Sequence, residues 1–216
     1  MKYPKINTIW KRDEKNKFRI IDGDFSKPEF DNIKNWHITE KIDGTNIRVK
    51  FETISGNGEV RFDGRTDEAQ IPAHLFAALQ KMFPVSVFEY GLEAFEETGT
   101  PLKSILYGEG YGAKIQKGGG IYRSDPGFIL FDVWVDGWWL NRESVEDIAK
   151  KLNIPSVPSL GTMDWQKAVD LVKSNPMSLA TNQPKIMEGI VARSHPLVLF
   201  RDGTPVMWKL KVRDYL

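Results

Sequence analysis

The sequence predicts an α+β fold in which antiparallel β-sheets are flanked by a few helices. Apolar and polar residues alternate in short runs that end at glycine-containing turns, which is typical of antiparallel strands. A few longer segments instead space their apolar residues at helical intervals. Many strands with a few interspersed helices indicate the α+β class.

The first half of the chain is expected to hold three strands, at residues 36–41, 47–51 and 60–62. The first two lie on either side of Asp43-Gly44. A helix is expected from Pro72, because proline suits the first turn of a helix and apolar residues recur behind it. Its buried face would carry Leu75, Leu79 and Met82. Residues 88–95 are expected to continue as helix.

The second half is expected to alternate strands with two helices. The expected strands are residues 104–109, 128–135, 138–140, 197–200 and 206–211. Asp136-Gly137 is a strong hairpin signal between the second and third of these. Asn141 is expected to cap a helix that runs to about Leu152, and a further helix to span residues 165–173.

Composition limits the class of protein. With 216 residues, 41% of them hydrophobic, we expect a single domain over residues 1–216. No apolar run approaches about eighteen residues, so no membrane span is expected. The absence of cysteine excludes disulfides and thiolate metal sites and suits a reducing cytoplasm. A net charge of +1 excludes a protein that coats nucleic acid, so any nucleic-acid contact must be local.

Residues 40–48, Glu-Lys-Ile-Asp-Gly-Thr-Asn-Ile-Arg, contain the most informative residue, Lys41. A lysine just ahead of an Asp-Gly turn is held rigidly at the end of a strand. Nearby cations or partial desolvation would favour its neutral, nucleophilic amine. The alternative is a β-hairpin with a surface lysine beside an ordinary turn.

The pattern Lys-x-Asp-Gly-x-x-x-Arg at residues 41–48 resembles the nucleotidyltransferase signature of ATP-dependent polynucleotide ligases and mRNA capping enzymes. Five further segments resemble the later motifs of that superfamily and follow in its order. They are Asp63–Thr66, Tyr107–Gly110, Ile129–Val133, Glu188–Val191 and Trp208–Lys211. Six motifs in order are a far more specific signal than one.

Residues 40–46 and 64–66 are most similar to the nick-sealing RNA ligase branch, which includes phage enzymes and kinetoplastid RNA-editing ligases. The resemblance implies the nucleotidyltransferase fold and an ATP-dependent RNA ligase that uses Mg²⁺ or Mn²⁺. Such an enzyme forms a covalent lysyl-AMP, transfers AMP to an RNA 5′-phosphate and seals it to a 3′-hydroxyl. Because the sequence ends soon after Lys211, no C-terminal domain is expected, and a separate RNA-binding protein or domain could replace it. The setting expected is the cytoplasm of a bacterium or a phage-infected cell.

The resemblance also implies a role for each motif residue. Lys41 would be the nucleophile, Lys209 and Lys211 would act with it on the phosphates, and Glu188 would support the metal. The remaining predicted nucleotide contacts are Glu40 and Ile42 at the base edge, Asn46 and Arg65 at the phosphates and ribose, Glu109 at the ribose hydroxyls, Phe131 stacked on adenine and Val191 on its opposite face.

Alternatives remain for several of these residues. Lys209 and Lys211 alternate on a strand and so share a face, but paired lysines also protect sheet edges. Phe131 lies in an apolar strand, where a core position is the ordinary outcome. The glycine-rich segment 114–122 could be a flexible loop near RNA or a solvent turn.

Three other functions also remain open. They are a DNA ligase core, a GTP-dependent capping-type core, and an inactive nucleotide-binding subunit of a partner.

Overall fold

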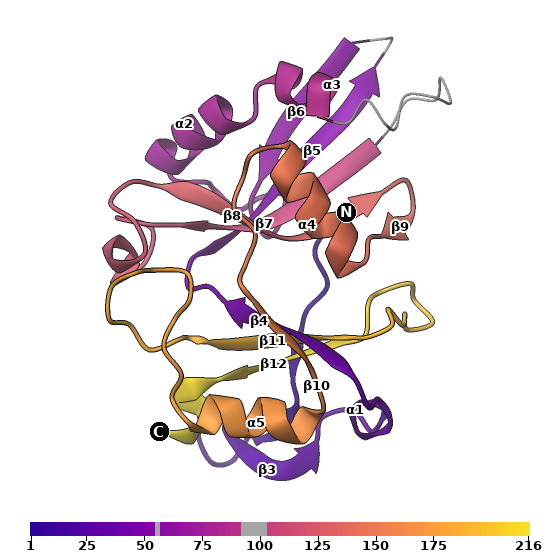
Figure 1. Cartoon of the computed structure of the whole chain (residues 1–216), viewed down its shortest axis with the longest axis vertical. Helices are drawn as coiled ribbons and strands as arrows, with labels where there is room; N and C mark the ends of the chain where they lie inside the picture. Colours follow the sequence, from indigo (N-terminus) through magenta and orange to yellow (C-terminus); the bar gives the residue numbers. More distant parts are fainter. Residues whose placement is uncertain (55–56, 92–102) are drawn as a thin grey trace. The chain divides into compact units, whose positions relative to one another are not determined.

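The computed structural model describes residues 1–54, 57–91 and 103–216 (Figure 1). These residues form two compact units. Unit 1 comprises Met1–Tyr3 and Asp43–Val157, and unit 2 comprises Pro4–Ile42 and Pro158–Leu216. Antiparallel ladders dominate both, so the predicted α+β class is confirmed.

Unit 1 is built on a five-stranded antiparallel sheet of order β6-β5-β7-β8-β9. Its strands are β5 (Thr45–Ile54), β6 (Asn57–Asp63), β7 (Lys103–Tyr111), β8 (Gly127–Val135) and β9 (Trp138–Trp139). The helices are α2 (Ala73–Met82), α3 (Val85–Gly91) and α4 (Arg142–Lys151), with a 3-10 turn η2 (Gly119–Ile121). The predicted helix from Pro72 is therefore confirmed. The expected helix at residues 88–95 can be followed as far as residue 91, within α3, and the rest of it lies outside the described residues.

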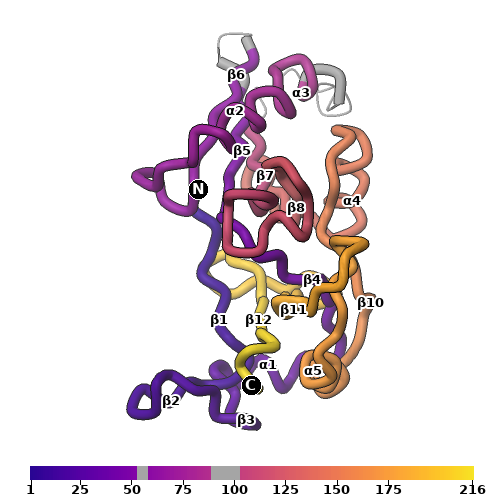
Figure 2. Tube along the Cα trace, turned by 90° about the vertical axis from the view of Figure 1, so that its left-hand side faces the viewer, coloured from indigo at the N-terminus to yellow at the C-terminus, as the bar shows by residue number. Residues whose placement is uncertain are grey.

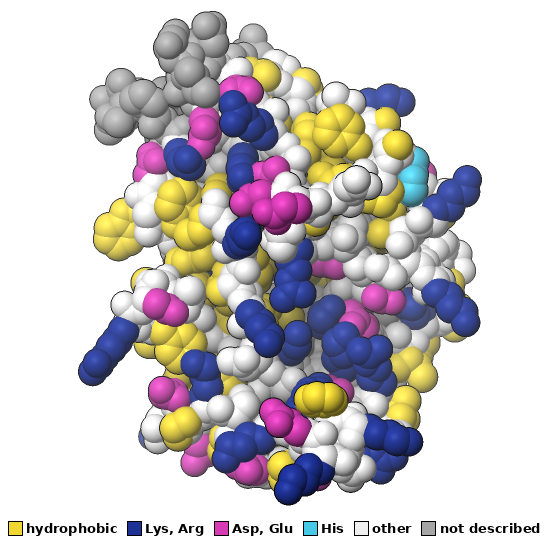
Figure 3. Space-filling view, turned by 180° about the vertical axis from the view of Figure 1, so that it is seen from behind, with side chains coloured by type: hydrophobic (Ala, Val, Ile, Leu, Met, Phe, Trp, Pro, Cys, Tyr) yellow, Lys and Arg dark blue, Asp and Glu magenta, His cyan; other side chains and the backbone are white. Residues whose placement is uncertain are grey.

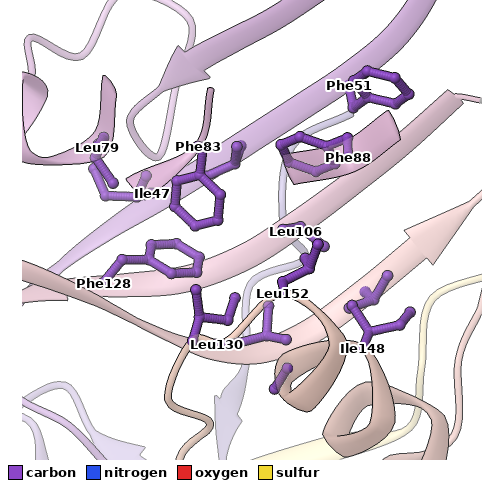
Figure 4. Packing of buried hydrophobic residues seen from close by; sticks show 14 of the residues in the cluster. Ile47, Phe51, Leu79, Phe83, Phe88, Leu106, Phe128, Leu130, Ile148 and Leu152 are labelled. Atoms are coloured by element: carbon purple, nitrogen blue, oxygen red, sulfur yellow. The ribbon is translucent and has the colours of Figure 1, made fainter. Parts of the chain in front are cut away.

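The core of unit 1 lies between this sheet and its helices (Figure 4). The rings of Phe51 and Phe88 stack with centroids 4.9 Å apart, and those of Phe83 and Phe128 meet edge to face at 5.2 Å. These contacts join β5 and β8 to α3 and to the end of α2. Burial of such large side chains provides most of the stabilisation of the unit.

Unit 2 contains a second five-stranded sheet, of order β1-β12-β11-β4-β10, and a separate β2–β3 hairpin. The strands are β1 (Asn7–Thr8), β2 (Trp10–Asp13), β3 (Arg19–Phe25), β4 (Trp36–Lys41), β10 (Ser159–Met163), β11 (Gly189–Ser194) and β12 (Met207–Lys211). Its helices are α1 (Glu29–Asn32) and α5 (Trp165–Lys173), and η3 (Val212–Tyr215) follows β12. Figure 2 shows β1 beside β12, with which it pairs in parallel.

The helices α4 and α5 each begin with a side-chain cap, and the predicted cap at Asn141 is confirmed. The Asn141 side chain accepts a hydrogen bond from the Ser144 N–H at the start of α4, and Asp164 accepts one from Lys167 at the start of α5. Each supplies a partner for an N–H group that the first turn leaves free. The predicted spans 142–152 and 165–173 are confirmed.

Two expectations are wrong: the hairpin alternative at Asp43-Gly44 and the strand at residues 197–200. β4 and β5 do not form a hairpin around Asp43-Gly44, because they belong to different sheets. Residues 197–200 form only an isolated bridge, Leu199 with Pro205, rather than a strand. The Val198 N–H donates instead to Ser194 Oγ at 2.8 Å, and the Val206 carbonyl accepts from the Ser194 N–H at 3.0 Å, so the ladder does not extend beyond this bridge.

In the part of the chain that the structure describes, no helix is long and apolar enough to cross a membrane.

Candidate active site

Lys41 lies at the end of β4, next to the start of β11 and the end of β12. Gly189, the first residue of β11, is paired with Lys41 on one side and with Lys211 on the other. A Cβ at Gly189 would lie 2.1 Å from the Leu210 carbonyl oxygen, so only glycine permits this close approach. The three strands therefore bring two lysines to the same end of the sheet.

Glu188 lies between these two lysines. Its Oε2 is 2.7 Å from Lys41 Nζ and its Oε1 is 2.6 Å from Lys211 Nζ. The three side chains are only 15–23% exposed. One carboxylate thus balances two ammonium groups, and the cluster keeps a net positive charge that suits a phosphate-bearing ligand.

Lys209 lies two residues before Lys211 on the same face of β12, opposite Val191 of β11. The alternative that this lysine pair protects a sheet edge is wrong, because β12 is an interior strand with β11 on one side and β1 on the other. Val191 is half-buried on the same face. Lys41, Lys209, Lys211 and Val191 thus share one face of the unit 2 sheet.

Glu40 faces the opposite side of β4 and is 1% exposed. Its Oε1 accepts a hydrogen bond of 2.5 Å from Ser178 Oγ, and its Oε2 accepts one of 2.8 Å from the Leu179 N–H. Burial raises the pKa of this carboxyl, and the Ser178 and Leu179 hydrogen bonds oppose that shift in part. Both oxygens hold the segment ahead of β11, and the neighbouring Ile42 is buried.

The remaining predicted residues belong to unit 1. Asn46 on β5 is directly opposite Glu109 on β7. Asn46 Oδ1 is buried and has no hydrogen-bond partner within the described residues. A buried acceptor without a donor is costly, so it suits a ligand hydroxyl or amine.

Phe131 is the extra residue of a β-bulge in β8. Tyr107 pairs with Asp132 and Gly108 with Leu130, which leaves Phe131 without a partner in the ladder. Its ring is half-buried between buried neighbours and meets the Tyr3 ring edge-on at 4.9 Å. The core alternative for Phe131 is therefore not what the structure shows.

Arg48, the last residue of the first motif, is fully buried. Its Nε donates to the Gly64 carbonyl at 2.8 Å and its Nη2 to Asp67 Oδ1 at 2.8 Å. The Arg48 guanidinium lowers the pKa of Asp67. Arg48 thus fixes residues 64–67, in which Arg65 is exposed.

The glycine-rich segment is a compact, internally bonded loop. The Ala113 N–H donates to the Arg123 carbonyl at 3.1 Å, and Tyr111 and Tyr122 meet edge to face at 6.0 Å. Gln116 Nε2 donates to the Gly44 carbonyl at 3.1 Å, which ties this loop to the Asp-Gly turn after Lys41. The segment is thus an exposed loop that is held at the Asp-Gly turn, and its contact with RNA stays a prediction.

Sequence analysis gave no role to Ser178, Gln116 or Arg48. Arg48 was marked only as the last residue of the Lys-x-Asp-Gly-x-x-x-Arg pattern. Ser178 and Gln116 contact residues far away in the chain, 138 and 72 positions respectively, and no local pattern marks such contacts.

Comparisons with known proteins show that the fold is shared with solved structures. The structure of Naegleria gruberi RNA ligase with PPi matches with a TM-score of 0.64 at 19% identity, over 100% of this chain and 57% of that chain. A mutant of the same ligase with ATP and Mn matches with a TM-score of 0.65 at 19% identity, over the same shares. The chain thus spans little more than half the length of these solved ligases.

No curated protein sequence matches the chain significantly. The RNA ligase family model matches residues 34–210, from just before the strand that carries Lys41 to the last residue before Lys211. Because that match covers most of the sequence, the chain belongs to the RNA ligase family.

Proposed function

We propose that the chain is an ATP-dependent RNA ligase that captures AMP on Lys41 and transfers it to an RNA 5′-phosphate for sealing to a 3′-hydroxyl. Residues 1–216 would act as a single adenylyltransferase domain. Family membership and the solved ligases with ATP, Mn and PPi support this proposal.

The observation that carries the proposal is the cluster of Lys41, Glu188 and Lys211. A surface lysine needs no such arrangement, whereas a phosphoryl-transfer site needs an amine beside positive charge. The three residues come from three different motifs and meet because β4, β11 and β12 are neighbours.

In the first step, Lys41 Nζ attacks the α-phosphorus of ATP, a nitrogen–phosphorus bond forms and pyrophosphate leaves. The Lys41 ammonium must lose a proton to expose its lone pair. Lys209 and Lys211 are placed to stabilise the negative charge that develops on the phosphate oxygens. Because each step is an in-line displacement, positioning and charge neutralisation are the main contributions of the protein.

The residues present fit a hydrated divalent cation. Within residues 1–54, 57–91 and 103–216, no three acidic or histidine side chains gather as a metal site. A single carboxylate such as Glu188, completed by water and phosphate oxygens, suits Mg²⁺ or Mn²⁺. A cation bound there would neutralise phosphate charge and weaken the hold of Glu188 on Lys41.

The nucleotide contacts in the proposal are those predicted above. Asn46 and Glu109 would contact the ribose, and the unpartnered Asn46 Oδ1 supports this assignment. Phe131 and Val191 would cover the two faces of adenine. Glu40 and Ile42 would lie near the base edge, and Arg65 near the phosphates.

The RNA steps need a substrate with a 3′-hydroxyl and a 5′-phosphate. A separate RNA-binding protein or domain could assist, and the absence of cysteine fits action in a reducing cytoplasm, as of a bacterial or phage-infected cell.

Lys41→Ala and Lys41→Arg should both abolish transfer of α-labelled AMP from ATP to the protein. Alanine removes the amine, and arginine keeps the charge but does not deprotonate under these conditions. Mass spectrometry of the wild type should show a fraction heavier by one AMP, attached at Lys41. Lys167→Ala, an exposed lysine on α5, is the matched control and should label normally. Undiminished labelling of Lys41→Ala would refute the nucleophile assignment.

Two comparisons separate the proposal from its rivals. Labelling from GTP in place of ATP would indicate a capping-type enzyme, and sealing of DNA nicks in preference to RNA nicks would indicate a DNA ligase. An intact protein that binds ATP and never labels would be an inactive nucleotide-binding subunit.

A further inference from the structure

The tip of the β2–β3 hairpin has an unusual conformation. Residues 14–18 connect the two strands, and Lys17 and Phe18 have φ angles of 50° and 56°. The Arg19 N–H donates to the Asn16 carbonyl at 3.0 Å, so these two residues are the centre of a tight turn. Positive φ at both centres normally selects Asn-Gly, and a phenylalanine there is a strained choice.

The surrounding contacts hold this strained turn in place. The Asp13 carbonyl accepts from the N–H groups of Asn16 at 3.2 Å and Phe18 at 3.0 Å. Arg12 Nη1 donates to the Phe18 carbonyl at 2.9 Å, and Arg12 Nη2 contacts Asp214 of η3 at 2.9 Å. The Phe18 ring is nevertheless 58% exposed, so it gains little from core packing. Strain that the fold maintains for an exposed side chain points to a role for that side chain.

Cationic residues lie close to Phe18 in the sequence, together with the acidic Asp13 and Glu14. Lys15, Lys17 and Arg19 are exposed and form no ion pair within the described residues, whereas Lys11 pairs with Asp24 at 2.8 Å. Figure 3 shows Lys and Arg side chains interspersed with Asp and Glu side chains over the lower part of the view. An exposed aromatic ring flanked by free cations matches the chemistry of single-stranded nucleic acid, with stacked bases and charged phosphates.

We propose that the hairpin tip binds single-stranded RNA, with a base stacked on Phe18 and neighbouring phosphates on Lys15, Lys17 and Arg19. The choice of RNA as the ligand rests on the proposed function. The hairpin precedes residue 34, where the RNA ligase family match begins, so family membership does not assign this role.

The test is fluorescence anisotropy of a labelled, unstructured oligoribonucleotide with the full chain. Phe18→Asn should weaken binding by about 5- to 100-fold, the loss expected for one stacked base. The same variant should melt at a higher temperature than the wild type, because asparagine tolerates positive φ better than phenylalanine. Phe18→Tyr keeps the ring and should bind within about twofold of the wild type. A purely structural role for Phe18 would not produce tighter folding together with weaker RNA binding.

The salt dependence of RNA binding tests the contribution of the three cations separately. Replacing Lys15, Lys17 and Arg19 together with glutamine should reduce the slope of log affinity against log salt by about 2, because each phosphate contact on a single strand contributes about 0.7. RNA affinity that is unchanged in both Phe18→Asn and the triple variant would overturn the proposal and leave a protein as the occupant of the tip. All variants should form the AMP adduct at the wild-type rate. An adduct missing from the wild type itself would refute the proposed function without refuting RNA binding by the hairpin.

Discussion

At the scale of single residues, the Glu188 carboxylate lies between two lysines of the candidate site. It accepts from Lys41 on one oxygen and from Lys211 on the other. An ammonium held by a carboxylate has no lone pair with which to attack phosphorus. In the proposed function, the same contact would orient Lys41 and restrain it until the charge of Glu188 is engaged elsewhere.

Glu188→Gln should slow formation of the AMP adduct at least about tenfold, because the amide cannot hold the divalent cation that the proposed function places at Glu188, and this loss outweighs the release of Lys41. Thermal stability should also fall, because the variant leaves the Lys41 and Lys211 ammonium groups, which are only 18–23% exposed, without a counter-charge. The measurement is the single-turnover labelling rate at saturating ATP. Asp147→Asn, which removes a surface pair with Lys151, is the control. An unchanged labelling rate in Glu188→Gln would contradict the proposed role of this carboxylate.

Glu40 gives the protein a pH dependence with a definite sign. Burial raises its pKa above the ordinary 4.5, so between 4.5 and the raised value the folded state binds more protons than the unfolded state. The unfolding free energy should therefore fall as pH rises through this window and level off above it. Chemical denaturation at a series of pH values measures the effect.

The unfolding free energy of Glu40→Gln should not fall with pH in this window, whereas that of Asp147→Asn should fall as in the wild type. A Glu40 carboxyl that titrates at or below 4.5 by NMR would contradict the expected shift.

The sequence predicted the candidate site residues that belong to motifs. It did not predict contacts between residues that are far apart in the chain. Lys41, Glu188 and Lys211 were identified from six short motifs in order. Ser178 on Glu40 and the bulge that turns Phe131 out of the core depend on register and on loops. Neither leaves a local pattern, because a bulge inserts one residue without changing composition.

At the level of elements, the Asp43-Gly44 turn connects two sheets and does not close a hairpin. A Cβ at Gly44 would lie 2.3 Å from the Gly110 carbonyl oxygen and 2.7 Å from Glu109 Cγ. The glycine is therefore required by the close approach of β7, a reason that differs from the turn chemistry used in the sequence analysis. The pattern was correctly recognised and its topology was not.

Gly44→Ala should destabilise the protein by about 1–3 kcal/mol, because the added methyl group meets backbone that cannot move aside freely. Gly120→Ala is the matched control, since its Cβ would find only Ala113 Cβ at 3.8 Å. Urea denaturation of both variants measures the difference. Equal free energies of unfolding for the two variants would contradict this expectation, because they would show that the β7 backbone at Gly110 moves to accommodate the methyl group.

Helices were the elements that sequence predicted best. The spans of α4 and α5 follow from the Asn141 and Asp164 caps and from helical spacing of apolar residues. Strand existence was also largely predictable, while pairing was not. Residues 197–200 have strand-like composition, but Ser194 takes the Val198 N–H and the Val206 carbonyl, so only an isolated bridge forms.

At the level of the whole molecule, neither unit is continuous in the chain. Residues 43–157 of unit 1 separate the two long segments of unit 2, and Met1–Tyr3 belong to unit 1. If unit 1 unfolded alone, unit 2 would have to keep the ends of a long disordered loop together. That closure has an entropic cost, which links the stabilities of the two units.

Differential scanning calorimetry should therefore show one cooperative transition, with calorimetric and van't Hoff enthalpies in agreement. This result would support the proposal that residues 1–216 form a single functional domain. Two resolved transitions, each abolished by a mutation in its own core such as Leu79→Ala or Ile190→Ala, would contradict it.

The bulge at Phe131 has a consequence for how the protein can vary. Because this residue is supernumerary in β8, exchanging its side chain leaves the inward-facing residues on both sides undisturbed. The side chain at position 131 can therefore change, by evolution or by mutagenesis, without altering the strand pairing of β8. Deleting the residue would remove the bulge and leave Leu130 and Asp132 as consecutive residues opposite Gly108 and Tyr107, so the neighbouring side chains would keep their faces and only the ring would be lost.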